Sequence, residues 1–368
     1  MREGVMSAER SLGALALALA LVVTGVTGCK DPDRYRKEFH EPYKLAGGKT
    51  LDPVTLNHGF EAFMLYCYGC HGEKGDGHGP ASLAMRPPPR NFQQGIFKFG
   101  GVAAGSLPVD DALDRTIRRG LNGTPMLQWD VPPVERKYLI AYIKTLSTKW
   151  QEEEPGAPIE ITPDPWKDKE QEAIARGKEV YHVAAEGHAG CSGCHASYAP
   201  RQEISDLMKK VTGSPAEDFA EEMYRTSLRE TEYALEANEK GEPTKTAQQL
   251  PPDFLYHKVK TAYPLETMVD GKAYTAEAQR EDLYRTIGAG VNGAAMPTWK
   301  GNLPEENLWA LTYYIQSLIK MRGTPEALAM REKLDAEPKW VPQPPAPAPE
   351  KPKDGKAPEP APKGGGSR

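Results

Sequence analysis

Apolar residues recur at helical spacing in two separate parts of the chain, one in each half. In residues 134–146 and again in residues 305–318, apolar side chains return every three or four positions, which is the period of one face of an α-helix. The residues that carry this pattern are Leu139, Ile140, Ile143 and Leu146 in the first segment and Leu308, Leu311, Ile315 and Leu318 in the second. Each segment is therefore predicted to be an amphipathic helix that covers a core.

A gapless internal repeat precedes these two helices. Residues 115–129 align with residues 285–299 at a constant offset of 170, and Arg, Thr, Ile, Gly, Asn, Gly, Met and Trp coincide. Upstream, the run Pro88-Pro89-Arg90-Asn91-Phe92 has a fainter counterpart in Pro251-Pro252-Asp253-Phe254. The 368 residues are long enough for two domains, and we expect two related ones in tandem, at 51–150 and 168–322.

A continuous apolar run, Leu12 to Val23, lies near the N-terminus and is followed by small residues before Cys29. This order is typical of a secretory signal. Val26-Thr27-Gly28-Cys29 resembles the lipobox of bacterial lipoproteins, in which the cysteine is lipidated and becomes the new N-terminus. We expect a signal peptide at residues 1–28 and lipidation of Cys29. An uncleaved membrane anchor is the alternative, although the run is short for a span of about 20 residues.

Polar segments separate and follow the predicted domains. Residues 29–50 are polar and lack periodicity, and are interpreted as a tether. Residues 151–167 are rich in charge and proline and are interpreted as a linker. Residues 323–368 are assigned to a Pro- and Lys-rich tail, which we expect to be disordered because such a composition cannot bury a core.

The second domain is longer than the first. The spacing from His71 to Met126 is 55 residues and that from His195 to Met296 is 101 residues. The extra 46 residues are assigned to an insertion at about 200–250, where charged runs such as residues 216–236 predict helices. We interpret the insertion as a solvated helical excursion, with a docking element for a partner as the alternative.

Composition excludes one class of partner. The formal net charge is −5, and 26% of the residues are charged against 39% hydrophobic, as in a soluble globular body. No basic stripe interleaved with aromatic residues occurs in the sequence, which argues against a nucleic-acid partner.

The cysteines carry the most specific chemistry. Apart from Cys29, all of them fall in two C-x-x-C-H motifs: Cys67, Cys70 and His71, and Cys191, Cys194 and His195. This motif attaches c-type haem, because each thiol adds to a vinyl group and the histidine becomes the proximal iron ligand. A zinc site would need two further ligands, and a thioredoxin-type pair would need a βαβ context. We therefore expect two covalently bound haems c.

Two methionines are candidates for the sixth iron ligand. Met126 and Met296 occupy the same position of the repeat, between Asn-Gly and Trp. The glycines predict a loop whose backbone can approach the macrocycle closely, and Pro125 and Pro297 stiffen it. The remaining histidines, which lack matching positions in the two repeats, are predicted to be surface or loop residues: His40, His58, His78, His182, His188 and His257.

Taken together, each unit resembles a class I cytochrome c domain. The resemblance implies an all-α fold with two tandem class I cytochrome c-type domains, the second with a helical insertion. It also implies a proline carbonyl that accepts a hydrogen bond from the proximal histidine. Pro80 matches that pattern, while Pro200 is the nearby candidate in the second domain. Trp129 and Trp299 stand where the family often places a propionate donor, with plain core packing as the alternative.

Two six-coordinate irons leave no open site for a substrate, so we expect a one-electron carrier and not an enzyme. A carrier tethered on the periplasmic side of a bacterial membrane suits a respiratory chain. Its partners would be a quinol-oxidising complex and a terminal oxidase or reductase. Residues 87–99 are similar to the lipid-anchored cytochrome subunits of alternative complex III. A dihaem peroxidase, with a removable sixth ligand, is the alternative. A thiosulfate-oxidising dihaem protein would fit best with a cysteine ligand, and no cysteine is left over for that role.

Overall fold

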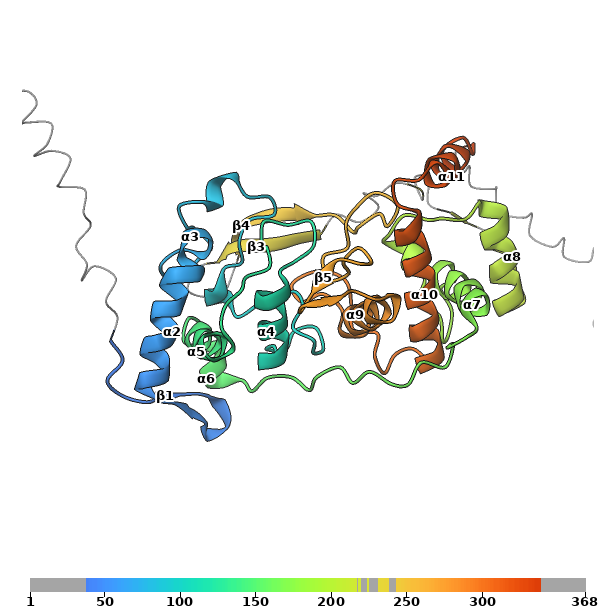
Figure 1. The fold of residues 1–368 in the computed structure, drawn as a ribbon. Coiled ribbons are helices and arrows are strands. Elements are labelled where there is room, and N and C mark those ends of the chain that lie inside the picture. The colour runs from blue at the N-terminus through green and yellow to red at the C-terminus, as the bar shows by residue number, and fades with distance from the viewer. Residues whose placement is uncertain (1–37, 217, 220–223, 225–230, 238–242, 339–368) are drawn as a thin grey trace, which may run out of the picture.

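The computed structural model describes residues 38–216, 218–219, 224, 231–237 and 243–338. The predicted signal peptide, Cys29 and the C-terminal residues 339–368 lie outside them. The described chain is mostly helical, with 45% helix, and forms two helical units joined by an extended segment along one side (Figure 1). Within the described ranges, no helix is long and apolar enough to cross a membrane.

The first unit is built around two packed helices. Its elements are the hairpin β1 (Tyr43–Lys44) and β2 (Thr50–Leu51), the helices α2 (Pro53–Tyr66), α3 (Tyr68–His71), α4 (Asp110–Arg119), α5 (Pro133–Lys144) and α6 (Lys149–Glu152), and the 3-10 turns η2 (Ala46–Gly48), η3 (Ser82–Ala84) and η4 (Phe92–Gln94). Helix α2 begins with Pro53, where the Asp52 carboxylate accepts a hydrogen bond from the Thr55 amide at 2.9 Å. Helix α5 confirms the first predicted amphipathic helix, and Phe63 of α2 packs on its Tyr142.

The second unit repeats this arrangement with additions. Its elements are α7 (Glu170–His182), the 3-10 turn η5 (Cys191–Gly193), α8 (Arg201–Thr212), the hairpin β3 (Thr231–Ala237) and β4 (Pro243–Gln249), the hairpin β5 (Met268–Val269) and β6 (Lys272–Ala273), α9 (Ala276–Ala289), α10 (Glu305–Met321) and α11 (Pro325–Asp335). Helix α10 confirms the second predicted amphipathic helix and packs on α7. Each unit buries its own apolar cluster.

A glycine sets the helix crossing in each unit. A Cβ atom at Gly59 of α2 would lie 2.2 Å from the Tyr138 carbonyl oxygen of α5, and one at Gly177 of α7 would lie 2.1 Å from the Ala310 carbonyl oxygen of α10. Real side chains cannot approach a backbone oxygen so closely. Both crossings therefore depend on backbone-to-backbone contact that only glycine allows.

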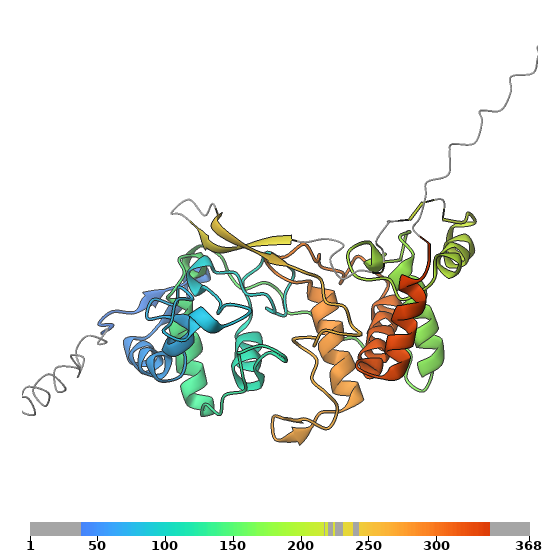
Figure 2. The same cartoon turned by 90° about the horizontal axis from the view of Figure 1, so that it is seen from above.

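Part of the insertion is a hairpin and not a helix. Helix α8 agrees with the predicted helical excursion, but residues 231–237, expected within a helical run, form strand β3, which pairs antiparallel with β4. Glu, Ala and Leu favour helices by intrinsic propensity, but strand formation depends on the pairing with a neighbouring strand, which helix propensity does not include. The hairpin extends from the second unit over the first (Figures 1 and 2). The all-α prediction is therefore correct only for the main elements.

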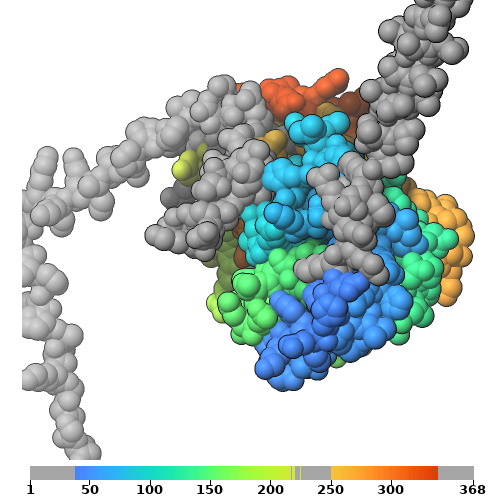
Figure 3. All heavy atoms as spheres, turned by 90° about the vertical axis from the view of Figure 1, so that its left-hand side faces the viewer, coloured from blue at the N-terminus to red at the C-terminus, as the bar shows by residue number. Residues whose placement is uncertain are grey.

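Two segments predicted to lack structure are ordered. Residues 38–50 of the expected tether form the β1–β2 hairpin, and Phe39 is fixed by a hydrogen bond from its amide to the Asn57 side chain at 2.7 Å. Together with α2, this segment forms the face of the first unit that points away from the second (Figure 3). Residues 325–335 of the expected tail form α11, because Thr324 caps the helix and Leu334 is buried.

The two units meet through reciprocal contacts. The Asn122 amide of the first unit donates to the Lys260 carbonyl of the second at 2.8 Å, and the Asn292 amide of the second donates to the Lys98 carbonyl of the first at 3.2 Å. The two asparagines are equivalent in the sequence repeat. The interface therefore has the exchange of contacts expected from two-fold symmetry, and it places the two methionine-bearing loops against the partner unit.

Candidate functional site

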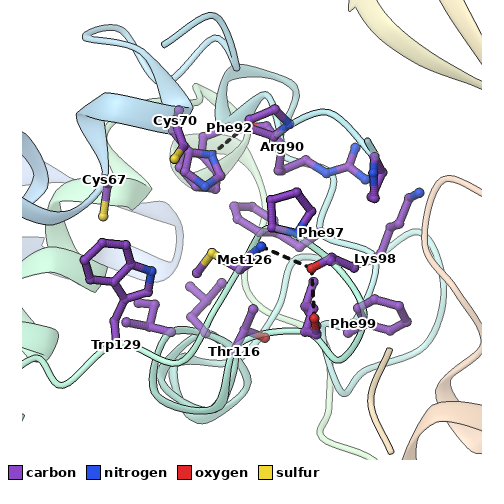
Figure 4. Close-up of a pocket in the computed structure, with 18 of the residues that line it drawn as sticks. Cys67, Cys70, Arg90, Phe92, Phe97, Lys98, Phe99, Thr116, Met126 and Trp129 are labelled. Atoms are coloured by element: carbon purple, nitrogen blue, oxygen red, sulfur yellow. Dashed lines mark hydrogen bonds between the residues drawn. The ribbon is translucent and has the colours of Figure 1, made fainter. Parts of the chain in front are cut away.

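The first unit contains a cavity of about 1350 Å³, counted with the space at its open mouth. Cys67, Cys70, His71 and Met126 all line it (Figure 4). The remaining walls are mainly apolar and come from residues 85–99, α4 and α5. Pockets for cofactors are usually lined by apolar side chains with a few placed polar groups. The lining of this cavity has that character, because two thiols and an imidazole face apolar walls.

The C-x-x-C-H motif begins where α2 ends. The Cys67 amide donates to the Phe63 carbonyl at 2.8 Å, and the His71 amide donates to the Cys67 carbonyl at 2.9 Å. Helix α3 is thus one turn, which brings both thiols and the imidazole to the same cavity. In the second unit the equivalent turn is a 3-10 turn, and the His195 amide donates to the Cys191 carbonyl at the same distance of 2.9 Å.

The imidazole of His71 is held by the loop before η4. Its Nδ1 atom lies 2.9 Å from the Arg90 carbonyl oxygen, and its ring stacks on Phe92 with 4.4 Å between centroids. Since a carbonyl only accepts, Nδ1 carries the proton and Nε2 is left as the ligand atom. The prediction that Pro80 supplies this carbonyl is wrong. Residues 77–81 instead bond to the backbone of the motif, through the Gly77 amide and the His71 carbonyl for example.

The second unit uses the matching loop. His195 Nδ1 lies 3.1 Å from the Pro252 carbonyl oxygen, and the ring stacks on Phe254 at 5.3 Å. The prediction of Pro200 is wrong, because Pro200 is the N-cap of α8 and its carbonyl accepts a hydrogen bond from the Ile204 amide at 3.1 Å. In both units the acceptor lies two residues before a phenylalanine. The faint similarity between residues 88–92 and residues 251–254, each a Pro-Pro pair shortly before a phenylalanine, was the signal that could have identified these carbonyls.

Burial keeps both histidines neutral. It lowers the pKa of His71 and of His195, although the hydrogen bonds to the carbonyls act in the opposite direction. A metal binds the neutral form of imidazole. Both side chains are therefore in the protonation state that an iron ligand requires.

The methionine loops close in the same way. The Leu121 amide donates to the Met126 carbonyl at 2.7 Å, and the Val291 amide donates to the Met296 carbonyl at 3.1 Å. Each loop follows a glycine with positive φ, and a Cβ atom there would lie 2.5 Å from backbone atoms of the loop itself. Glycine is required for so tight a closure, which in the first unit directs Met126 into the cavity.

Residues 56–147 match the family model described as "Cytochrome c". This range contains most of α2, the first C-x-x-C-H motif and Met126. The chain contains a cytochrome c domain. Such a domain implies covalently bound haem c, and the cavity fits that group because two thiols, a neutral imidazole and a thioether line it together.

A solved structure is similar over more than this domain. A chain of the "reducing HAO-like protein complex" of Kuenenia stuttgartiensis matches with a TM-score of 0.50 and 25% sequence identity, over 71% of this chain and 96% of that one. Since 71% of 368 residues exceeds the length of either unit, the match extends into both. No curated protein matches the chain in sequence.

The first thiol of each C-x-x-C-H motif lacks the lowered pKa that a redox pair requires. Cys67 and Cys70 form no disulfide, and neither do Cys191 and Cys194. Burial raises the pKa of Cys67 and of Cys191 to about 12, whereas a thioredoxin-type site needs a lowered thiol pKa. In the part of the chain that the structure describes, no group of three or more His, Cys, Asp or Glu side chains is placed to hold a metal.

Trp129 lies at the end of the cavity where Cys67 lies (Figure 4), and its ring is 6.5 Å from that of Tyr66. That position does not favour a role as propionate donor, and Trp299 packs on the core of the second unit. Among the described residues that line the cavity, His71 is the sole histidine. His188, close in sequence to Cys191, instead lies 3.2 Å from Glu179.

Proposed function

We propose that the protein is a dihaem cytochrome c that carries electrons, with one haem attached at Cys67 and Cys70 and a second at Cys191 and Cys194. The observation that carries the proposal is the cavity of the cytochrome c domain, where the thiols of one motif, its histidine and Met126 converge. When bound, the haem iron supplies a one-electron couple.

In this proposal the iron would be held by His71 and Met126 in the first unit and by His195 and Met296 in the second. The carbonyl bonds behind the histidines fix the rotation of each ring and present Nε2 to the iron. The thioether is a soft ligand that favours the ferrous state, which raises the reduction potential. An iron held by two protein side chains in this way would suit electron transfer better than substrate turnover.

The arrangement of the units supports electron transfer between the two sites. The loops that bear Met126 and Met296 each hydrogen-bond to the other unit, through Asn122 and Asn292. We propose that electrons pass across this interface and leave to a protein partner. The similarity to a chain of an HAO-like complex supports a role as the electron-transfer subunit of a larger redox assembly. A quinol-oxidising complex and a terminal oxidase or reductase are the proposed partners.

We further propose that lipidated Cys29 anchors the protein on the periplasmic side of a bacterial membrane. Because residues 38–50 pack on the first unit, residues 29–37 would have to span the gap, with a reach of about 30 Å at roughly 3.3–3.6 Å per residue. Cys29→Ser should abolish labelling by a fatty-acid precursor and release the protein from membranes. Labelling that persists in this variant would contradict the lipid anchor.

Haem counting tests the central proposal. Mass spectrometry and the pyridine haemochrome spectrum of the exported protein should give two haems per chain. Cys67→Ala/Cys70→Ala and Cys191→Ala/Cys194→Ala should each leave one. Met126→Ala and Met296→Ala should each remove the weak red absorption band of one methionine–ferric iron pair, with both haems still attached. A high-spin ferric signal in the unaltered protein would instead favour a peroxidase.

A further inference from the structure

Three cationic side chains meet at one end of the cavity of the cytochrome c domain. Arg90 and Lys98 come from the first unit, while Lys260 comes from the second, and all three line the cavity. Arg90 and Lys98 lie at the end opposite Cys67 (Figure 4). The second unit therefore forms part of the wall of the first cofactor site.

The position of Lys260 is set by the interface between the units. Its backbone carbonyl accepts the hydrogen bond from the Asn122 amide, while the Asn122 side-chain amide donates to the carbonyl of Ala262 at 2.7 Å. These bonds use backbone atoms of the second unit. The Lys260 side chain can therefore be changed without removing the contacts that join the two units.

The three positive charges affect one another. Burial, together with the nearby charges of Lys260 and Arg90, lowers the pKa of Lys98 to about 7. Burial and Arg90 also lower the pKa of Lys260. A cationic cluster in a partly desolvated site is stabilised by anions that enter it.

We propose that Arg90, Lys98 and Lys260 form a binding site for the two propionate carboxylates of the haem held by the first unit, so that the second unit completes the first haem site. The inference rests on the proposed function, because it takes a haem to be bound at Cys67 and Cys70. Haem carries its carboxylates on the edge away from the vinyl groups, to which the thiols attach. Arg90 and Lys98 lie at the end of the cavity away from Cys67, where those carboxylates would lie. Binding of haem and docking of the two units are then coupled.

Lys260→Gln tests the proposal through the reduction potential. Removing a cation beside the propionates favours the more positive ferric haem, so the potential should fall. We expect a shift of about tenfold in the oxidation equilibrium, which is about 59 mV for one electron. The step of the redox titration that belongs to the haem of the first unit is identified as the one that also shifts in Met126→His. Lys260→Arg, which keeps the charge, should leave the potential near that of the unaltered protein.

Lys258→Gln is the matched control, because Lys258 is exposed on the same loop and does not line the cavity. An equal shift in Lys258→Gln and Lys260→Gln would overturn the inference while leaving two attached haems, and so the proposed function, intact. Loss of haem from Cys67 and Cys70 in the unaltered protein would overturn both. If Lys260→Gln does not accumulate, Lys260→Met, which retains an apolar stem, replaces it in the same comparison.

Discussion

The loops behind the two candidate proximal histidines have the same shape but different charge. In the first unit the Asn91 side-chain oxygen accepts a hydrogen bond from the Gln93 amide at 2.9 Å. In the second, the Asp253 carboxylate accepts one from the Leu255 amide at 3.0 Å. Both turns directly follow the carbonyl that bonds to the histidine. The second unit therefore has a carboxylate where the first has a neutral amide.

The carboxylate is fully buried and is neutralised from outside the repeat. Asp253 forms a salt bridge with Arg331 of α11 and accepts a hydrogen bond from the Tyr198 hydroxyl at 3.0 Å. Burying a charge is tolerated only when it is paired and hydrogen-bonded. Helix α11 is thus a structural requirement of the second site, which explains why this C-terminal segment is ordered.

Breaking the Asp253–Arg331 pair should give the largest difference in stability between the two units. Arg331→Met leaves Asp253 buried without its cation, and the loss of one partner of a buried pair costs about 3–5 kcal/mol of unfolding free energy. Urea denaturation would measure it, with limited proteolysis to locate the unit that opens. Lys333→Met, on the exposed part of the same helix, should change stability by less than about 0.5 kcal/mol. Equal effects of the two variants would contradict a structural role for the pair.

Low pH should destabilise the second unit more than the first. The prediction that His182 is a surface or loop residue is wrong, because it is buried in the last turn of α7. Burial lowers its pKa to about 4, and its neutral ring accepts a hydrogen bond from the Tyr198 amide at 3.1 Å. Because the folded-state pKa lies below the usual 6.5, its contribution is fully present above pH 6.5. It is lost as the pH falls towards 4, by about 3 kcal/mol in total. His182 lies five residues after Gly177, the crossing glycine of the second unit. In the first unit the residue five positions after Gly59 is Met64, which cannot titrate.

The variant His182→Gln checks this pH dependence. Unfolding free energies measured between pH 7 and pH 4 should fall less steeply in the variant than in the unaltered protein. Met64→Gln provides the matching change in α2 and should leave the slope unaltered. An unchanged slope in His182→Gln would show that other groups cause the acid sensitivity.

Local sequence patterns predicted the features that depend on residues close together in the chain. The helices α5 and α10 follow from apolar periodicity, and the shared cavity of the first motif and Met126 agrees with the grouping inferred from the repeat. The carbonyls of Arg90 and Pro252 could not be assigned, because a hydrogen bond across 19 or 57 residues depends on where loops pack. Strand β3 likewise depends on its pairing with β4, and the ordering of α11 depends on the distant Asp253.

Exchanging Asp253 and Asn91 would test whether the charge of this side chain makes the two haem reduction potentials different. Asp253→Asn places in the second unit the residue that the first already uses in the same turn, so the turn should persist, although the loss of the ion pair with Arg331 lowers the stability of the second unit. Asp253 acts on His195 by raising its pKa against the effect of burial, which stabilises positive charge at the site. Its removal should disfavour ferric iron and raise the second potential by up to about 59 mV, or tenfold. Asn91→Asp should lower the first potential in the same way. Potentiometric titration resolves both steps, and shifts of the same sign in the two variants would show that the loop charge does not set the difference.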